Sequence, residues 1–552
     1  MEKSMENKNI ENKDSQAQLL KGSAWMTAGS ILSRILGALY IIPWYAWMGK
    51  DGNLANAITA QSYNIYSLFI IVSTAGIPGA VAKQIAKYNA LNEYGVSRKL
   101  FHRGLLLMIG FGIVCAGLMF GLAPILAGQD ARQVPVLKSL SYAILIIPLM
   151  SLMRGYFQGF NDMMPSALSQ FIEQLARVAW MLMTAYVIMK IQDGNYLRAV
   201  TQSNLAAAIG AMFGILLLVY YYQKQKAKMD NLVENSNNEL QVSTNSLLLE
   251  IVQQSIPFII IDSGINIFQL VDQYTFHPIM ASFVHASFDQ IESMYALFGL
   301  NANKLIMIIV SLSTAMAVTA IPLLSGAKAR RDYQDIRKQI ENTLELFFFF
   351  MIPSAFGMAA ISTPIYTIFY SFDPVGSNVL FIASFTAIIL GLFTVLMAVQ
   401  QGLSENILAI KYLVVGLIVK CIIQYPLIRL FQVNGPLIAT DLAFLFTILL
   451  SLKHLKVAFH FNFKRTKRRF IGIMSFSAIM FIVIFALQFI LGKFIPADRR
   501  ITAMILVAIC VVVGALVYGF LALISGLAHS ILGSKISKLE RKLHINYYNP
   551  KH

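Results

Sequence analysis

The chain alternates between apolar runs of roughly 20 residues and short polar stretches over most of its length. A run of that length is what an α-helix needs to cross a bilayer core of roughly 30 Å. The pattern predicts an all-α polytopic membrane protein with about 14 transmembrane helices. The predicted spans lie near 20–47, 56–82, 104–127, 139–160, 166–189, 199–222, 247–273, 296–321, 343–370, 378–403, 407–430, 435–452, 470–492 and 502–526.

Composition agrees with this class, because 57% of the residues are hydrophobic, only 13% are charged and the mean hydropathy is +0.64. The net charge of +17 does not indicate a nucleic-acid partner, since most of the 44 Lys and Arg residues lie in short loops and tails beside apolar runs. These residues concentrate on the side that holds both termini. The positive-inside rule therefore predicts that both termini are cytoplasmic.

Motifs of soluble enzymes are missing from the sequence, which contains no GxxxxGK[ST], HExxH, CxxC or GxSxG. The three cysteines lie in apolar runs, so a disulfide framework is not expected. His277 and His285 share a predicted outer loop at 274–295 with two carboxylates, and a solvated loop is favoured over a metal site there. We expect a transporter without a bound cofactor rather than an enzyme.

Two stretches of similar sequence indicate an internal repeat. Span 2 ends in AGIPGAVAKQIAK and span 8 in TAIPLLSGAKARR; 81 residues separate Pro78 from Gly159, and 80 separate Pro322 from Gly402. Each glycine is followed 18 residues later by a cation. These offsets predict two six-helix lobes in parallel, pseudo-twofold orientation, plus two C-terminal helices. The predicted parts are a disordered cytoplasmic tail at 1–18, an N-lobe at 19–222, a cytoplasmic linker at 223–246, a C-lobe at 247–455, spans 13 and 14 at 456–526 and a basic cytoplasmic tail at 527–552.

Span 5 carries a polar stripe inside the predicted membrane region. Gln170, Glu173, Gln174 and Arg177 are spaced i, i+3, i+4 and i+7, which places them on one side of a helix. Lipid cannot solvate such a stripe, so it must face protein or water. We assign a structural role to these residues and to Lys420 of span 11, and we favour an ion pair between Glu173 and Arg177 one helical turn apart.

Other polar groups inside the spans are candidates for function, because an ionisable group at mid-membrane costs about 2.5–3.5 kcal/mol on insertion scales. A cationic cavity between two helical halves suits an anionic substrate, and Arg in particular suits phosphate or pyrophosphate. Two carboxylates of span 7 could bind Na⁺ or carry a proton, and either could instead form a buried ion pair with Arg34. The candidate cavity residues are Ser30, Arg34, Arg154, Asn301 and Lys304, and the candidate coupling residues are Asp262 and Asp272.

Several motifs resemble those of one transporter family. They are SRILG at 33–37, STAGIPGAVAKQIAKY at 73–88, RGYFQGFNDMMPSALSQFIEQLAR at 154–177 and QQGL at 400–403. With them, most of the chain resembles the lipid-linked oligosaccharide flippases of the MOP superfamily, in the SpoVB/YtgP branch that includes the MurJ-type lipid II flippases. In this comparison Arg34 falls on a cavity arginine of the MurJ type. The arginines expected further along span 1 and in span 2 are absent here.

The resemblance implies two lobes around a V-shaped cavity, alternating access driven by membrane potential or a Na⁺ or H⁺ gradient, and a lipid-tail groove along spans 13 and 14. It also implies the bacterial plasma membrane and an undecaprenyl-pyrophosphate-linked cell-wall precursor as substrate, with lipid II leading. Membrane lipids and the cell-wall synthesis machinery are the expected partners. The alternatives are a flippase for another polyprenyl-linked glycan such as teichoic acid or capsule units, a MATE-like antiporter, and a membrane transferase acting on the lipid carrier.

Overall fold

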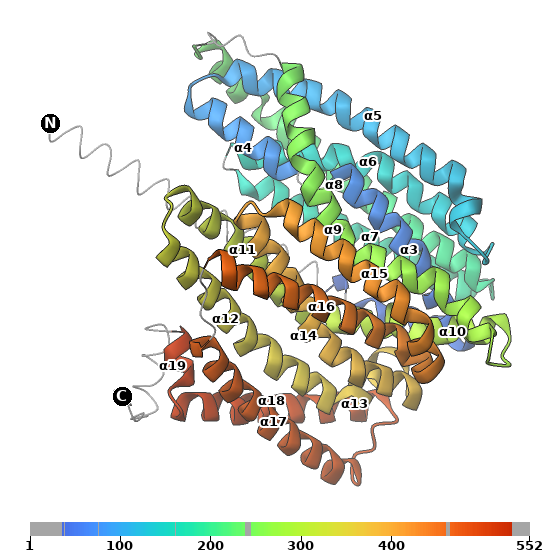
Figure 1. Cartoon of the computed structure of the whole chain (residues 1–552). Coiled ribbons are helices and arrows are strands. Elements are labelled where there is room, and N and C mark those ends of the chain that lie inside the picture. Colours follow the sequence, from blue (N-terminus) through green and yellow to red (C-terminus); the bar gives the residue numbers. More distant parts are fainter. Residues whose placement is uncertain are drawn as a thin grey trace. The chain divides into compact units, whose positions relative to one another are not determined.

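The computed structural model describes residues 36–37, 39–74, 77–160, 162–237, 244–459 and 464–532. All regular elements within these ranges are helices, which confirms the all-α class (Figure 1). The chain divides into two units, Met1–Leu270 and Val271–His552, with the boundary inside α9, Thr244–Ala281. Each unit is described separately below.

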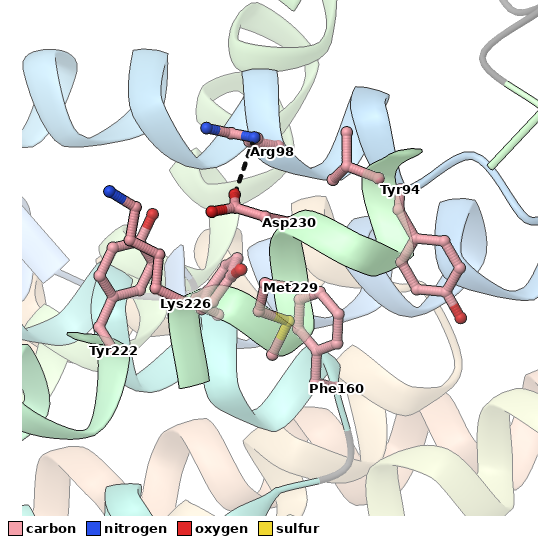
Figure 2. Close-up of a pocket in the computed structure, with 9 residues that line it drawn as sticks. Tyr94, Arg98, Phe160, Tyr222, Lys226, Met229 and Asp230 are labelled. Carbon is pink, nitrogen blue, oxygen red and sulfur yellow. Dashed lines mark ion pairs between the residues drawn. The ribbon is translucent and has the colours of Figure 1, made fainter. Parts of the chain in front are cut away.

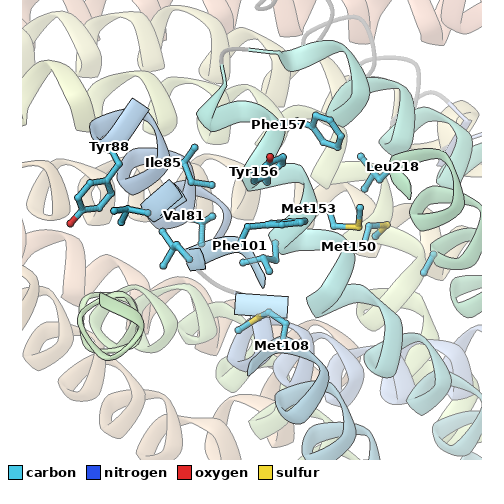
Figure 3. Packing of buried hydrophobic residues seen from close by; sticks show 14 residues of the cluster. Val81, Ile85, Tyr88, Phe101, Met108, Met150, Met153, Tyr156, Phe157 and Leu218 are labelled. Atoms are coloured by element: carbon cyan, nitrogen blue, oxygen red, sulfur yellow. The ribbon is translucent and has the colours of Figure 1, made fainter. Parts of the chain in front are cut away.

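The first unit is built mainly from long helices that pack around a core rich in aromatic residues. Its elements are α2 (Ile41–Met48), η1 (Gly49–Asp51), α3 (Gly52–Thr74), α4 (Ile77–Ala90), α5 (Tyr94–Leu126), α6 (Gln133–Gly159), α7 (Met163–Tyr186), η2 (Val187–Ile191), α8 (Tyr196–Glu234) and the first part of α9. Helix α6 packs against α5 on one side and α8 on the other, and α8 also packs against α7. In the core, the rings of Phe101 and Tyr156 are 4.1 Å apart, between α5 and α6 (Figure 3).

The second unit holds the rest of α9 and, among the described residues, twelve further helices or turns of helix. They are α10 (Phe288–Ala296), η3 (Leu297–Ala302), α11 (Asn303–Ala329), α12 (Tyr333–Ala360), α13 (Ser362–Tyr370), α14 (Pro374–Gly402), α15 (Asn406–Phe431), η4 (Gln432–Asn434), α16 (Gly435–Ala458), α17 (Lys464–Gly492), α18 (Arg500–Ile524) and α19 (Leu527–Leu532). Helices α17 and α18, the predicted spans 13 and 14, pack against α12 and α13 (Figure 1). The Tyr518 hydroxyl of α18 donates to the Phe349 carbonyl of α12 at 3.0 Å.

Eleven helical stretches among the described residues are long and apolar enough to cross a membrane. One of them, Asn406–Ala458, has 53 residues and would extend about 80 Å if it were straight. It turns at η4 and therefore provides two crossings, α15 and α16. Predicted span 2 covers α3 and α4, which are not among the eleven and between which residues 75–76 lie outside the described residues. Most of predicted span 1 also lies outside them. The total of fourteen stays a prediction.

The predicted repeat is supported by one contact that occurs in both units. Gly159 ends α6, and a Cβ atom on it would lie 2.7 Å from the Ile85 Cβ atom of α4. Gly402 ends α14, and a Cβ atom there would lie 3.1 Å from the Leu324 Cβ atom of α11. Gly159 therefore allows α6 to pack closely on α4 in the first unit, and Gly402 allows α14 to pack closely on α11 in the second. The two contacts involve corresponding spans of the predicted repeat, spans 4 and 2 in one case and spans 10 and 8 in the other.

Gly159→Ala and Gly402→Ala are each expected to lower the free energy of unfolding by about 1–3 kcal/mol, because the added methyl group meets packed atoms that must move. The measurement is the apparent Tm of the purified protein in detergent. Gly117→Ala in α5 is the matched control, since a Cβ atom there meets nothing within 4 Å. An equal shift in all three variants would contradict the proposed close contacts.

Candidate functional site

Two residues on or beside the polar stripe of α7, Glu173 and Ser169, form hydrogen bonds to the neighbouring helices α6 and α8. Arg154 of α6 donates from Nη2 to Glu173 Oε2 at 2.7 Å and to Ser169 Oγ at 2.9 Å. The Ser169 hydroxyl in turn donates to the Gly214 carbonyl of α8 at 3.2 Å. The predicted ion pair between Glu173 and Arg177 is therefore wrong, because Arg154 from the adjacent helix takes the Glu173 carboxylate. A role for Arg154 in substrate contact stays a prediction.

Two glycines of α8 allow the close approach that this arrangement needs. A Cβ atom on Gly210 would lie 2.6 Å from the Glu173 carbonyl oxygen, and one on Gly214 would lie 3.3 Å from the Glu173 Cβ atom. Their four-residue spacing is the small-xxx-small pattern that brings helix backbones together in membranes. The motif GAMFG at 210–214 is visible in the sequence, but the helix that packs on it is not.

The other half of the stripe faces α3 and the beginning of the described chain. The Arg177 guanidinium carbon lies 5.7 Å from the centre of the Tyr63 ring, and its other electrostatic neighbours are Tyr66 and Tyr40. One turn earlier, the Gln174 amide nitrogen lies 3.3 Å from where a Cβ atom on Gly37 would be. The stripe is therefore covered by protein, as its polarity requires.

The second unit contains a buried ion pair that joins three helices. Lys420 of α15 is fully buried, and its Nζ donates to Asp272 Oδ2 of α9 at 2.8 Å. Lys420 also donates to the Thr440 hydroxyl of α16. Gln424, one turn beyond Lys420, donates from Nε2 to Asp272 Oδ1 at 2.8 Å and to Thr275 Oγ1 at 3.1 Å. The sequence placed Asp272 and Lys420 in separate roles, and the structure brings them into one network.

This network limits what Asp272 can bind. Both of its carboxylate oxygens already accept a hydrogen bond, one from Lys420 and one from Gln424. Each oxygen can still accept more, but a sodium ion at Asp272 would lie beside the Lys420 ammonium group, whose positive charge repels it. A second carboxylate, Asp441, follows Thr440 in α16 and accepts from the Thr386 hydroxyl at 2.9 Å.

The remaining predicted site residues are dispersed. Asn301 in η3 is fully buried and donates to the Tyr366 hydroxyl at 2.8 Å, so contact with a substrate would require this bond to open. Lys304 in α11 and Gln170 in α7 are half-buried, and Asp262 in α9 is exposed. The last two candidates, Ser30 and Arg34, lie outside the described residues.

The predicted outer loop at 274–295 is largely helical, because α9 continues to Ala281 and α10 starts at Phe288. The His277 ring lies 4.3 Å from the Phe288 ring. Within the described part of the chain, no three His, Cys, Asp or Glu side chains gather where they could hold a metal ion. The roles of His277 and His285 stay open.

A small pocket lies in the first unit between the start of α5, the end of α6 and the end of α8 (Figure 2). Arg98 and Asp230 form an ion pair of 3.0 Å at its edge, and Tyr94, Phe160 and Tyr222 contribute aromatic walls. None of these residues was among the predicted site residues. The ion pair fixes the last turns of α8, which extends to Glu234 and so contains the first part of the predicted linker.

The model of the polysaccharide biosynthesis protein family matches residues 19–328 of the chain. The chain belongs to this family. It is 32% identical over 542 residues to the lipid II flippase MurJ of Bacillus subtilis (strain 168), which covers 95% of this chain and 99% of that relative. The predicted resemblance to the MurJ-type lipid II flippases and the expectation of a transporter rather than an enzyme are thereby confirmed.

Solved structures of family relatives show the same fold. An inward closed conformation of the lipid II flippase MurJ matches with a TM-score of 0.62 at 15% identity, covering 92% of this chain and 99% of that chain. An inward-facing MATE multidrug resistance transporter of the MOP superfamily matches with a TM-score of 0.61 at 12% identity, covering 77% and 94%. These matches show that the chain has the same fold as the two transporters.

Proposed function

We propose that this protein is a flippase that moves lipid II, an undecaprenyl-pyrophosphate-linked cell-wall precursor, from the inner to the outer leaflet for peptidoglycan synthesis. The observation that carries the proposal is the 32% identity to a lipid II flippase over 95% of the chain. Supporting it are buried polar stripes inside apolar helices, a feature expected of transport proteins rather than of simple membrane anchors. We place the protein in the bacterial plasma membrane with both termini in the cytoplasm.

Alternating access needs parts that keep their shape while they move. Each unit has its own internal charge network: Arg154 with Glu173 in the first, and Lys420 with Asp272 in the second. We propose that these networks hold the two units rigid during a rocking motion of the kind that internal repeats support. The cell-wall synthesis machinery is the proposed partner that receives the flipped substrate.

We propose that the positively charged residues predicted to line the cavity contact the substrate. Arg34 and Lys304 suit the pyrophosphate, since Arg binds phosphate oxygens through paired hydrogen bonds and Lys adds a point charge. Coupling is proposed for Asp262 and Asp272. At Asp272 the coupling cation, Na⁺ or H⁺, would have to compete with the Lys420 ammonium group, which already occupies one carboxylate oxygen.

The proposal predicts that cells depleted of this protein lose lipid II from the outer surface, and that re-supply restores it. The measurement is the accessibility of lipid II to an impermeant reagent, in a strain without another lipid II flippase. Arg34→Ala, present at wild-type level in the membrane, is expected to restore at most about a tenth of the signal because a charged contact to the pyrophosphate is lost. Unchanged accessibility after depletion would exclude lipid II and point to another polyprenyl-linked glycan.

A further inference from the structure

We propose that Arg177, rather than forming part of the structural ion pairing, is a second binding residue for the pyrophosphate of the lipid-linked substrate. This inference rests on the proposed flippase function. Its starting point is the pairing of Glu173, whose carboxylate is taken by Arg154 at 2.7 Å. Among the residues that the structure describes, Arg177 has no ion-pair partner.

The surroundings of Arg177 are polar but uncharged. The centre of the Tyr63 ring lies 5.7 Å from its guanidinium carbon, the two side chains share a hydrogen bond, and Tyr66 and Tyr40 are its other electrostatic neighbours. Phenol groups are neutral near pH 7, so they orient a guanidinium group without neutralising it. A half-buried cation inside a helical bundle is costly unless an anion compensates it. A pyrophosphate supplies that charge and accepts paired hydrogen bonds from the guanidinium group.

The internal repeat provides a comparison within the same chain. Arg177 follows Gly159 by the same number of residues as Lys420 follows Gly402, so the two cations are equivalent positions of the repeat. Lys420 is fully buried and neutralised by Asp272 at 2.8 Å. Arg177 remains partly exposed and has three tyrosines instead of a carboxylate. A carboxylate therefore balances the charge of Lys420, whereas the charge of Arg177 faces only neutral phenol groups.

The position of Arg177 also fits a substrate site. Gln174 lies against Gly37, and Arg177 is an electrostatic neighbour of Tyr40, so both pairs have the same sequence offset. A constant offset is what two parallel helices side by side produce. Arg177 therefore projects from the side of α7 that faces Gly37 and Tyr40.

The test measures binding to the full-length protein in lipid nanodiscs. The probes are lipid II, undecaprenyl pyrophosphate, which lacks the sugar-peptide head group, and undecaprenol, which lacks the pyrophosphate as well. Arg177→Gln is expected to weaken lipid II binding by about tenfold or more and to leave undecaprenol binding unchanged. Arg177→Lys keeps the charge but not the planar fork, so a loss of severalfold is expected. Arg132→Gln is the matched control, because Arg132 pairs with Asp130 at 2.8 Å.

Each outcome decides a different question. If wild-type protein binds lipid II and both Arg177 variants bind it equally well, the role of Arg177 is overturned and the flippase proposal stands. If wild-type protein does not distinguish lipid II from undecaprenol, the proposed function and this inference both fail. Size-exclusion profiles check folding, and if Arg177→Gln aggregates, the Arg177→Lys comparison decides alone.

Discussion

Asp272→Ala is expected to cause one of the two largest losses of stability in this protein, about 3–5 kcal/mol. The substitution leaves the Lys420 ammonium group fully buried without a carboxylate, and it also removes one of the two acceptors of Gln424. A buried charge without its partner is far more costly than a buried pair. The measurement is the apparent Tm in detergent, together with the amount of protein that reaches the membrane.

The double variant Asp272→Ala with Lys420→Met separates a pair effect from a general packing effect. Replacing both charges by apolar groups is often neutral, so the double variant is expected to recover most of the lost stability. If it is no more stable than Asp272→Ala alone, the uncompensated charge is not the cause. Transport by the recovered double variant would assign Asp272 a structural role only, whereas a folded but inactive double variant would support coupling.

The sequence predicts the class of the protein and the positions of its polar stripes, because both depend on local periodicity. Apolar runs specify helices that cross a membrane, and the i, i+3, i+4, i+7 spacing in α7 specifies one polar side. Partner choice cannot be predicted in this way. Glu173 lies one turn from Arg177 in the sequence, yet its carboxylate binds Arg154, whose approach depends on how α6 and α7 pack.

Contacts between distant segments are hidden for the same reason. Asp272 and Lys420 are 148 residues apart, and nothing in either local sequence connects them. Helix boundaries are partly visible: the predicted spans at 407–430 and 435–452 correctly separate α15 from α16, whereas predicted span 1 at 20–47 runs into the turn at Tyr40 before α2. The repeat offsets align Gly159 with Gly402, and the structure adds a contact that the sequence does not predict, since Gly159 packs on α4 and Gly402 on α11.

Reversing one charge of the α6–α7 ion pair is the second change with a large expected effect. The Arg154 Nη2 atom lies 2.7 Å from Glu173 Oε2 in the ion pair. Glu173→Arg replaces this carboxylate with a second cation beside the Arg154 guanidinium group. Two like charges in a partly buried bundle repel strongly, so we expect the loss of most folded protein from the membrane. Arg154→Glu is expected to have a similar effect, because Glu173 would then face another carboxylate.

The charge-swapped variant, Arg154→Glu with Glu173→Arg, restores an ion pair with the opposite orientation. It is expected to recover folded protein substantially, because the attraction across α6 and α7 is re-established. Transport then distinguishes the two roles proposed for Arg154. A folded, active swap means that Arg154 only holds the helices together, whereas a folded swap that binds lipid II at least tenfold more weakly means that its positive charge also contacts the substrate. No recovery of folded protein would contradict the pairing itself.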